Sequence, residues 1–185
     1  ALMDRFFEGG DFTYREMMTG LHQGVKELSL FPVFCGSSVT CLGSLMLMDH
    51  IVDMLPNPTE GRLYDVVTAD GKEEEFAAAP GGVPVAYVFK TVADPFVGKL
   101  SFIKVLSGKL TAASNTVNAR TGQPERMGKT LIVCGKKQTD TAAITTGDIG
   151  VVSKLATAKT GDTLCDPARV VALPAPVYPV SCYRM

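Results

Sequence analysis

Residues 85–106 read VAYVFKTVADPFVGKLSFIKVL, and the period of two at the start of this stretch decides the fold class. Val85, Tyr87 and Phe89 alternate with the residues between them, as the two faces of a β-strand require. Further short runs, each bounded by turn residues, follow at 100–106, 126–134 and 149–155. Short strands at this spacing predict an all-β barrel or sandwich in this part of the chain.

The N-terminal part has a different pattern, that of an α/β unit. Thr13 and Glu16 have the spacing of a capping box at the start of a predicted helix over 11–28. The apolar run 30–34 predicts a buried strand of a parallel sheet. A second helical stripe over 45–55 ends before two prolines.

Charge is unevenly distributed, although the formal net charge of the 185 residues is only −1. Residues 1–83 hold 5 Lys and Arg against 13 Asp and Glu, whereas residues 84–166 hold 11 against 6. An acidic front and a basic middle suggest two modules, the second facing a polyanion. Ordinary solvated surface explains the same charge distribution about equally well.

Several classes of protein are excluded by the composition. No run of about 18 apolar residues is present, so no transmembrane helix is expected. The 5 cysteines show no two-residue spacing typical of zinc or redox pairs, which indicates reduced thiols in a cytoplasmic protein. His22 and His50 lack patterned catalytic neighbours, so both are interpreted as surface or packing residues.

The motifs of a nucleotide hydrolase are also missing. The sequence contains no Gly-x-x-x-x-Gly-Lys-Ser/Thr phosphate loop, no Asp-x-x-Gly for magnesium and no Asn-Lys-x-Asp for guanine. We therefore expect these residues alone to be catalytically inactive, with no catalytic residue, cofactor or metal of their own.

Three ordered blocks nevertheless resemble the elongation factor G family of translation GTPases. The first is PVFCGSS at 32–38 with IVDMLPNP at 51–58, which looks like the end of that family's GTPase domain. The second, DPFVGKL at 94–100 with VLSGKL at 105–110, is similar to the opening strands of its domain II. The third, with TGDI at 146–149 and TGDTLCD at 160–166, is similar to the closing strands.

This resemblance implies a mainly β chain, a translation-factor domain II β-barrel preceded by the final α/β portion of a GTPase domain. It divides the chain into the GTPase-domain end at 1–58, a linker at 59–83, the barrel at 84–168 and the start of domain III at 169–185. The parent protein would be a cytoplasmic, ribosome-binding GTPase that uses GTP and magnesium in translocation. Its partners would be small-subunit ribosomal RNA and its own remaining domains, with no membrane.

Candidate site residues follow from the same resemblance. Gly36, Ser37 and Ser38 correspond to the fifth guanine-nucleotide motif, with Ser38 where the family usually has Ala. That motif presents backbone and side-chain groups to the guanine base. The basic residues near strand ends and turns that we expect to contact RNA are Lys99, Arg120, Arg126 and Lys129.

Two other interpretations stay open. A ribosomal protection or release-factor-type GTPase shares this barrel, although DPFVGKL at 94–100 favours elongation factor G. A small-ligand- or flavin-binding enzyme barrel is the remote alternative, and it would need a ligand motif that the sequence does not contain.

Overall fold

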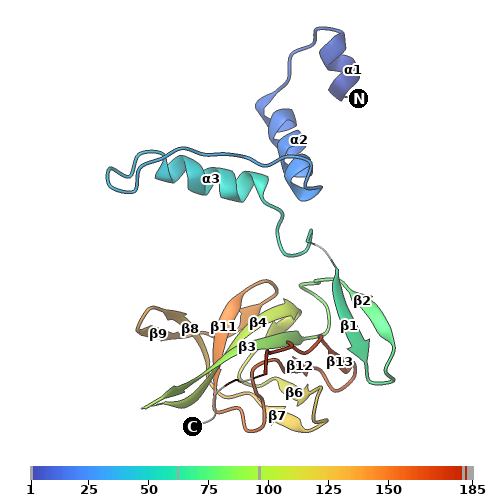
Figure 1. The fold of residues 1–185 in the computed structure, drawn as a ribbon, viewed down its shortest axis with the longest axis vertical. Coiled ribbons are helices and arrows are strands. Elements are labelled where there is room, and N and C mark those ends of the chain that lie inside the picture. Colours follow the sequence, from blue (N-terminus) through green and yellow to red (C-terminus); the bar gives the residue numbers. More distant parts are fainter. Residues whose placement is uncertain (1, 62, 96, 181, 183–185) are drawn as a thin grey trace. The chain divides into compact units, whose positions relative to one another are not determined.

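The computed structural model describes residues 2–61, 63–95, 97–180 and 182 (Figure 1). The chain divides into two compact units, Ala1–Asn57 and Pro58–Met185, and each is described by itself. None of the helices in the described ranges is long and apolar enough to cross a membrane.

The first unit is helical. Its helices are α1 (Leu2–Phe7), α2 (Tyr14–Lys26) and α3 (Ser44–Met54). The capping box predicted for α2 is confirmed, because the backbone N–H of Glu16 donates to Thr13 Oγ1 at 3.3 Å and that of Thr13 donates to Glu16 Oε2 at 2.9 Å. These bonds satisfy two N–H groups that the first helical turn leaves free.

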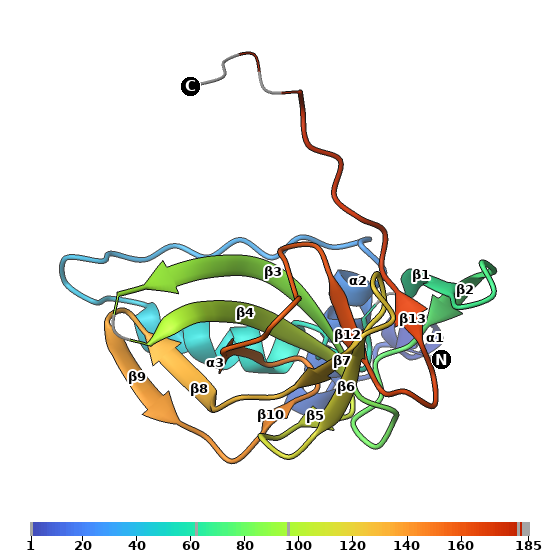
Figure 2. The ribbon, with the colours of Figure 1, turned by 90° about the horizontal axis from the view of Figure 1, so that it is seen from below.

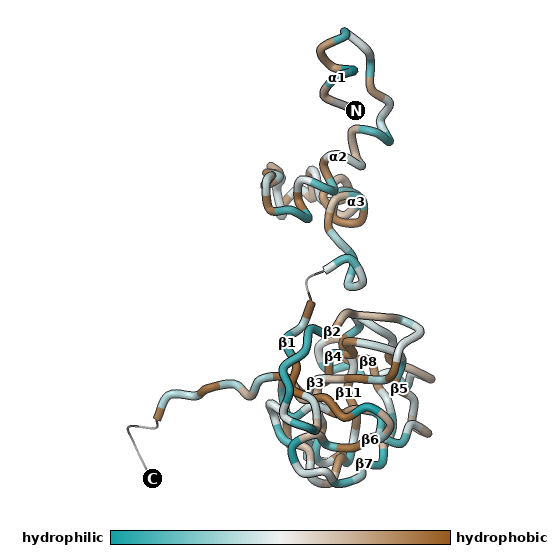
Figure 3. Tube along the Cα trace, turned by 90° about the vertical axis from the view of Figure 1, so that its right-hand side faces the viewer, coloured by the Kyte–Doolittle hydropathy of each residue, from teal (hydrophilic) through white to brown (hydrophobic). Residues whose placement is uncertain are grey.

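The buried strand predicted at 30–34 is wrong. This segment has no regular structure, and the side chains of Phe31 and Val33 are 75% and 88% exposed. A buried strand needs partners on both edges, and the described part of this unit offers only the isolated bridge between Ser37 and Leu42. Most residues of helix α3 are apolar (Figure 3), yet only Met54 in it is buried.

The second unit, Pro58–Met185, is called the strand unit below and is built from antiparallel sheets (Figures 1 and 2). The largest has eight strands in the order β7-β6-β12-β3-β4-β11-β8-β9. Its strands are β3 (Val85–Asp94), β4 (Gly98–Ser107), β6 (Asn115–Asn118), β7 (Pro124–Arg126), β8 (Thr130–Cys134), β9 (Lys137–Asp140), β11 (Ile149–Ser153) and β12 (Thr163–Cys165). A separate pair is formed by β5 (Lys109–Leu110) and β10 (Ile144–Thr145).

The mainly β class is confirmed, but the predicted closed barrel is not. Within the described residues no ladder joins β7 to β9, the two outer strands of the eight-stranded sheet. Strand β7 is only three residues long, and it is tied to the loop after β11 by the side chain of Glu125. The side chain of Glu125 therefore anchors β7 to this loop, and the hydrogen-bonded sheet remains open between β7 and β9.

Two strands of a third sheet lie in the segment for which the sequence analysis predicted a linker. Strands β1 (Tyr64–Thr68) and β2 (Glu73–Phe76) pair with each other, and β1 also pairs with β13 (Val171–Ala172). Its apolar side is narrow: Val66, Phe76 and Val171 are buried in a cluster that also includes Val85.

The main core lies on one face of the large sheet. Ile103 and Val105 of β4, Val152 of β11 and Leu164 of β12 are buried there in one cluster. On the other face, Leu100 packs with Leu131 and Val151 in a smaller cluster. Successive side chains of β4 point to opposite faces of the sheet and pack in two different clusters, so both faces of β4 are apolar.

Candidate nucleic-acid interface

The four predicted RNA-contacting residues do not have equivalent surroundings. Lys99 lies at the start of β4 and is partly buried, whereas Arg126 ends β7 and is exposed. Lys129 is 75% exposed and its Nζ lies 3.3 Å from Asp140 Oδ2. Such an exposed ion pair is worth little, about 0–1 kcal/mol, so Lys129 remains available to an external anion.

Arg120 is occupied by an internal carboxylate. Its Nε and Nη2 donate to the two oxygens of Asp162 at 2.6 and 2.9 Å. Asp162 is buried, and it also accepts from Asn118 Nδ2 at 2.8 Å and from the backbone N–H of Lys159 at 2.9 Å. Arg120 therefore has a structural role that accounts for its position without RNA.

The ionisation of this pair follows from its hydrogen bonds. Burial alone would raise the pKa of Asp162, but the hydrogen bonds from Arg120, the Lys159 backbone and Asn118 outweigh burial and lower that pKa. The hydrogen bond with Asp162 correspondingly raises the pKa of Arg120. Both groups are thus charged at neutral pH.

Glu125 is a second buried carboxylate, and sequence analysis did not single it out. Its side chain accepts the backbone N–H groups of Ala156, Thr157 and Ala158 at 2.9, 2.6 and 2.7 Å, and the Thr157 hydroxyl at 2.5 Å. Burial would raise the pKa of Glu125, but these hydrogen bonds outweigh it and lower that pKa. The carboxylate therefore holds three consecutive backbone groups in place.

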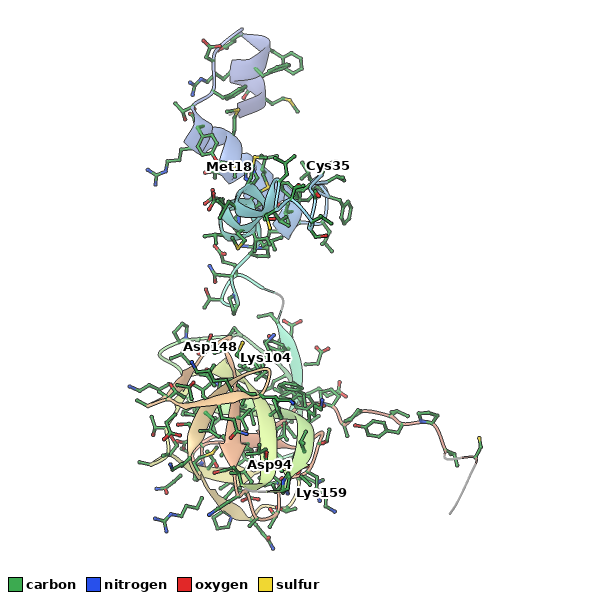
Figure 4. The ribbon with its side chains drawn as sticks, turned by 90° about the vertical axis from the view of Figure 1, so that its left-hand side faces the viewer. Met18, Cys35, Asp94, Lys104, Asp148 and Lys159 are labelled. Carbon is green, nitrogen blue, oxygen red and sulfur yellow. The ribbon has the colours of Figure 1, made fainter. Side chains whose placement is uncertain are left out.

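The two carboxylates fix one loop, residues 154–162: Glu125 holds its middle at 156–158, and Asp162 ties its end to Asn118 and Arg120. Lys99 adds a third anchor, because its Nζ donates to the carbonyl oxygen of Ala158. The loop has little regular structure but presents Lys154 and Lys159 to solvent. Figure 4 places Lys159 and Asp94 near one end of the strand unit and Lys104 and Asp148 near the other.

This arrangement changes the set of candidate RNA contacts. Lys99 and Arg120 hold the loop, whereas Arg126, Lys129, Lys154 and Lys159 offer exposed cationic groups. Sequence reasoning missed the two loop lysines because they follow no motif. Their one signal was position: Lys154 lies near the end of a predicted strand, and Lys159 directly precedes the TGD turn at 160–162.

The predicted guanine-contacting loop is a compact turn in the helical unit. The backbone N–H of Ser37 donates to the carbonyl of Leu42 at 3.0 Å, and Ser37 Oγ accepts from the backbone N–H of Thr40 at 3.4 Å. A Cβ at Gly36 would lie 2.9 Å from the Leu42 carbonyl oxygen, so glycine is needed there. Ser38 is exposed in this turn, and its predicted contact with guanine stays a prediction.

We predict that the 185-residue chain does not bind GTP tightly. Phosphate and magnesium contacts carry much of the affinity of nucleotide sites, and the turn at 36–38 can contribute only contacts to the base. Calorimetric titration of the chain with GTP in the presence of magnesium is expected to give no measurable heat of binding. A micromolar dissociation constant would contradict this expectation.

Among the described residues, no group of three or more His, Cys, Asp or Glu side chains is placed to hold a metal ion.

The fold and the loop define an antiparallel β-domain with a fixed, basic loop at one end. Comparison with known proteins gives a family match for part of the chain: residues 84–167 match the family model described as Elongation factor G domain 2. The resemblance inferred from the motif blocks is confirmed over these residues.

A solved structure of a protein from Thermus thermophilus is similar in fold, with a TM-score of 0.69 and 24% sequence identity. The match covers 89% of this chain and 22% of the Thermus chain, so the present residues span a small part of that protein's length.

Proposed function

We propose that this chain is part of a cytoplasmic, ribosome-binding translation GTPase of the elongation factor G type, which promotes GTP-dependent translocation. The observation that carries the proposal is the match of residues 84–167 to Elongation factor G domain 2. In this proposal the strand unit rests on small-subunit ribosomal RNA and supports the GTPase domain. GTP and magnesium would be bound mainly by other parts of the parent protein, with Gly36, Ser37 and Ser38 contacting guanine.

The basic loop gives this role a physical basis. Phosphate contacts by Lys and Arg release condensed counterions and so favour RNA binding at moderate salt. Lys154 and Lys159 are exposed, and their backbone N–H groups are already held by the Lys99 carbonyl and by Asp162, so little ordering entropy is lost when RNA binds. Lys129 adds a third exposed cation beside the loop.

We predict that the chain binds RNA weakly and without sequence preference, with an affinity that falls steeply between about 50 and 200 mM salt. Charge reversal at Lys129 or Lys154 should weaken binding to any RNA sequence and flatten the slope of affinity against salt, because each removes a phosphate contact. Fluorescence anisotropy with labelled small-subunit RNA fragments measures both quantities.

Lys109→Glu is the matched control. Lys109 is an exposed lysine of β5 and pairs with Thr145, whose hydroxyl bonds Asp148. Asp148 lies at the end of the unit opposite Lys159 in Figure 4. If Lys109→Glu weakens binding as much as Lys154→Glu, or if binding is insensitive to salt, this surface is not the one that faces RNA.

A further inference from the structure

A pocket of about 510 Å³ lies beside the fixed loop, next to the smaller cluster of the large sheet. Its lining residues are Val97, Gly128, Lys129, Leu131, Gln138, Asp140, Ser153 and Lys154. Pockets that bind small ligands commonly measure about 300–1,000 Å³, so this one has room for a ligand of nucleotide size.

The floor of the pocket is aliphatic and fixed. Leu131 is buried against Leu100 and Val151, and Val97 packs on the same cluster. The backbone N–H of Val97 donates to Asp94 Oδ1 at 2.8 Å, which holds the backbone of Val97 in place. The flat face of a base can pack on such a floor without a hydrogen-bonding partner beneath it.

Two lysines meet at the rim because their backbones are in close contact. The N–H of Ser153 donates to the carbonyl of Lys129 at 3.2 Å, and a Cβ at Gly128 would lie only 2.1 Å from the Ser153 carbonyl oxygen. Lys154 follows with a left-handed backbone (φ 60°), held by its own N–H bond to the carbonyl of Lys99 at 3.0 Å. The side chains of Lys129 and Lys154 therefore start from neighbouring backbone positions.

The polar groups of the rim suit a nucleotide better than a bare anion. Lys154 makes no side-chain hydrogen bond or ion pair within the described residues, and Lys129 shares only the exposed pair with Asp140. Asp140 repels a free phosphate but can accept a ribose hydroxyl or an exocyclic amine. The Gln138 amide can both donate to and accept from a base edge.

We propose that this pocket receives one unpaired nucleotide of RNA, with its base on Val97 and Leu131, its edge at Gln138 and its phosphate at Lys129 and Lys154. The inference rests on the proposed RNA-binding function and adds a preference to it. A base within a duplex is stacked on both faces and cannot enter the pocket, so the site selects single-stranded or looped RNA.

The test compares a short single-stranded RNA with the duplex that it forms with its complement, both titrated into the isotope-labelled chain. We expect the single strand to shift the amide signals of Val97, Leu131, Gln138 and Lys154, and to bind about tenfold more tightly than the duplex in the same salt. Val97→Trp, which fills the pocket without altering charge, should remove this difference while leaving duplex binding unchanged.

Val92→Trp is the matched control, since Val92 is an exposed valine of β3 outside the pocket. Gln138→Ala, on the exposed strand β9, tests the base edge without risk to the core and should weaken only single-strand binding. Equal affinity for both RNAs, with no effect of Val97→Trp or Gln138→Ala, would overturn this inference but leave the proposed function standing. Absence of binding to either RNA would overturn both.

Discussion

Replacement of Glu125 by alanine is expected to lower the free energy of unfolding of the strand unit by about 3–5 kcal/mol. The substitution removes the acceptor of three backbone N–H groups, in Ala158, which is buried, Thr157, which is half-buried, and Ala156, which is exposed. Each unsatisfied buried donor costs about 1–3 kcal/mol, partly offset where water enters. Hydrogen exchange of the β3 and β4 amides measures the change as denaturant is added.

Glu73→Ala provides the control for this prediction, because Glu73 is an exposed glutamate of β2. It should change the stability by no more than about 0.5 kcal/mol. Glu125→Gln should fall between the two, since an amide oxygen can still accept one or two of the bonds. A loss below about 1 kcal/mol for Glu125→Ala would mean that the loop at 154–162 is not anchored as described.

Replacement of Asp162 by asparagine is expected to cost about 2–4 kcal/mol at neutral pH and much less in acid. The pKa of Asp162 is lower in the folded chain than in the unfolded one, so its contribution is complete above the unfolded value of about 4. The contribution is lost as the pH falls through the folded value. Stability of the two proteins should therefore converge below about pH 4, which urea unfolding at several pH values can measure.

Arg120→Ala separates the carboxylate's role from that of its charged partner. The Arg120 side chain is half exposed, whereas Asp162 keeps its bonds from Asn118 and Lys159 without it. The arginine variant should thus lose less stability than Asp162→Asn. A cost for Asp162→Asn that is the same at neutral and acid pH would show that its ionised form is not what stabilises the fold.

Local patterns predicted well where neighbours in the sequence determine the structure. The capping box at Thr13 and Glu16 closes within three residues, and the alternation that begins at Val85 and the short run at 100–106 fall in strands β3 and β4. The loop anchor could not be predicted in this way. Glu125 meets its partners 31 to 33 positions later, and nothing around Pro124 and Arg126 marks the residue between them as buried.

The errors have physical causes of the same kind. An apolar run such as 30–34 forms a buried strand only if other strands flank it. The sequence of the run itself does not show whether such strands are present. Strands β1 and β2 were missed because three successive glutamates hide the alternation, and only Phe76 in β2 is buried. Closure of the barrel would require a ladder between β7 and β9, and the three residues of β7 leave little backbone for one.

The open sheets also determine how this unit behaves when molecules crowd together. An outer strand presents free N–H and C=O groups that can recruit a strand of a second chain. Here three outer strands are poor templates for such growth: β2 carries successive glutamates, β9 is wholly exposed with Lys137 and Asp140 at its ends, and β7 begins with a proline. Along these three edges the strand unit should therefore resist the slow fibre growth to which unprotected sheet edges are prone.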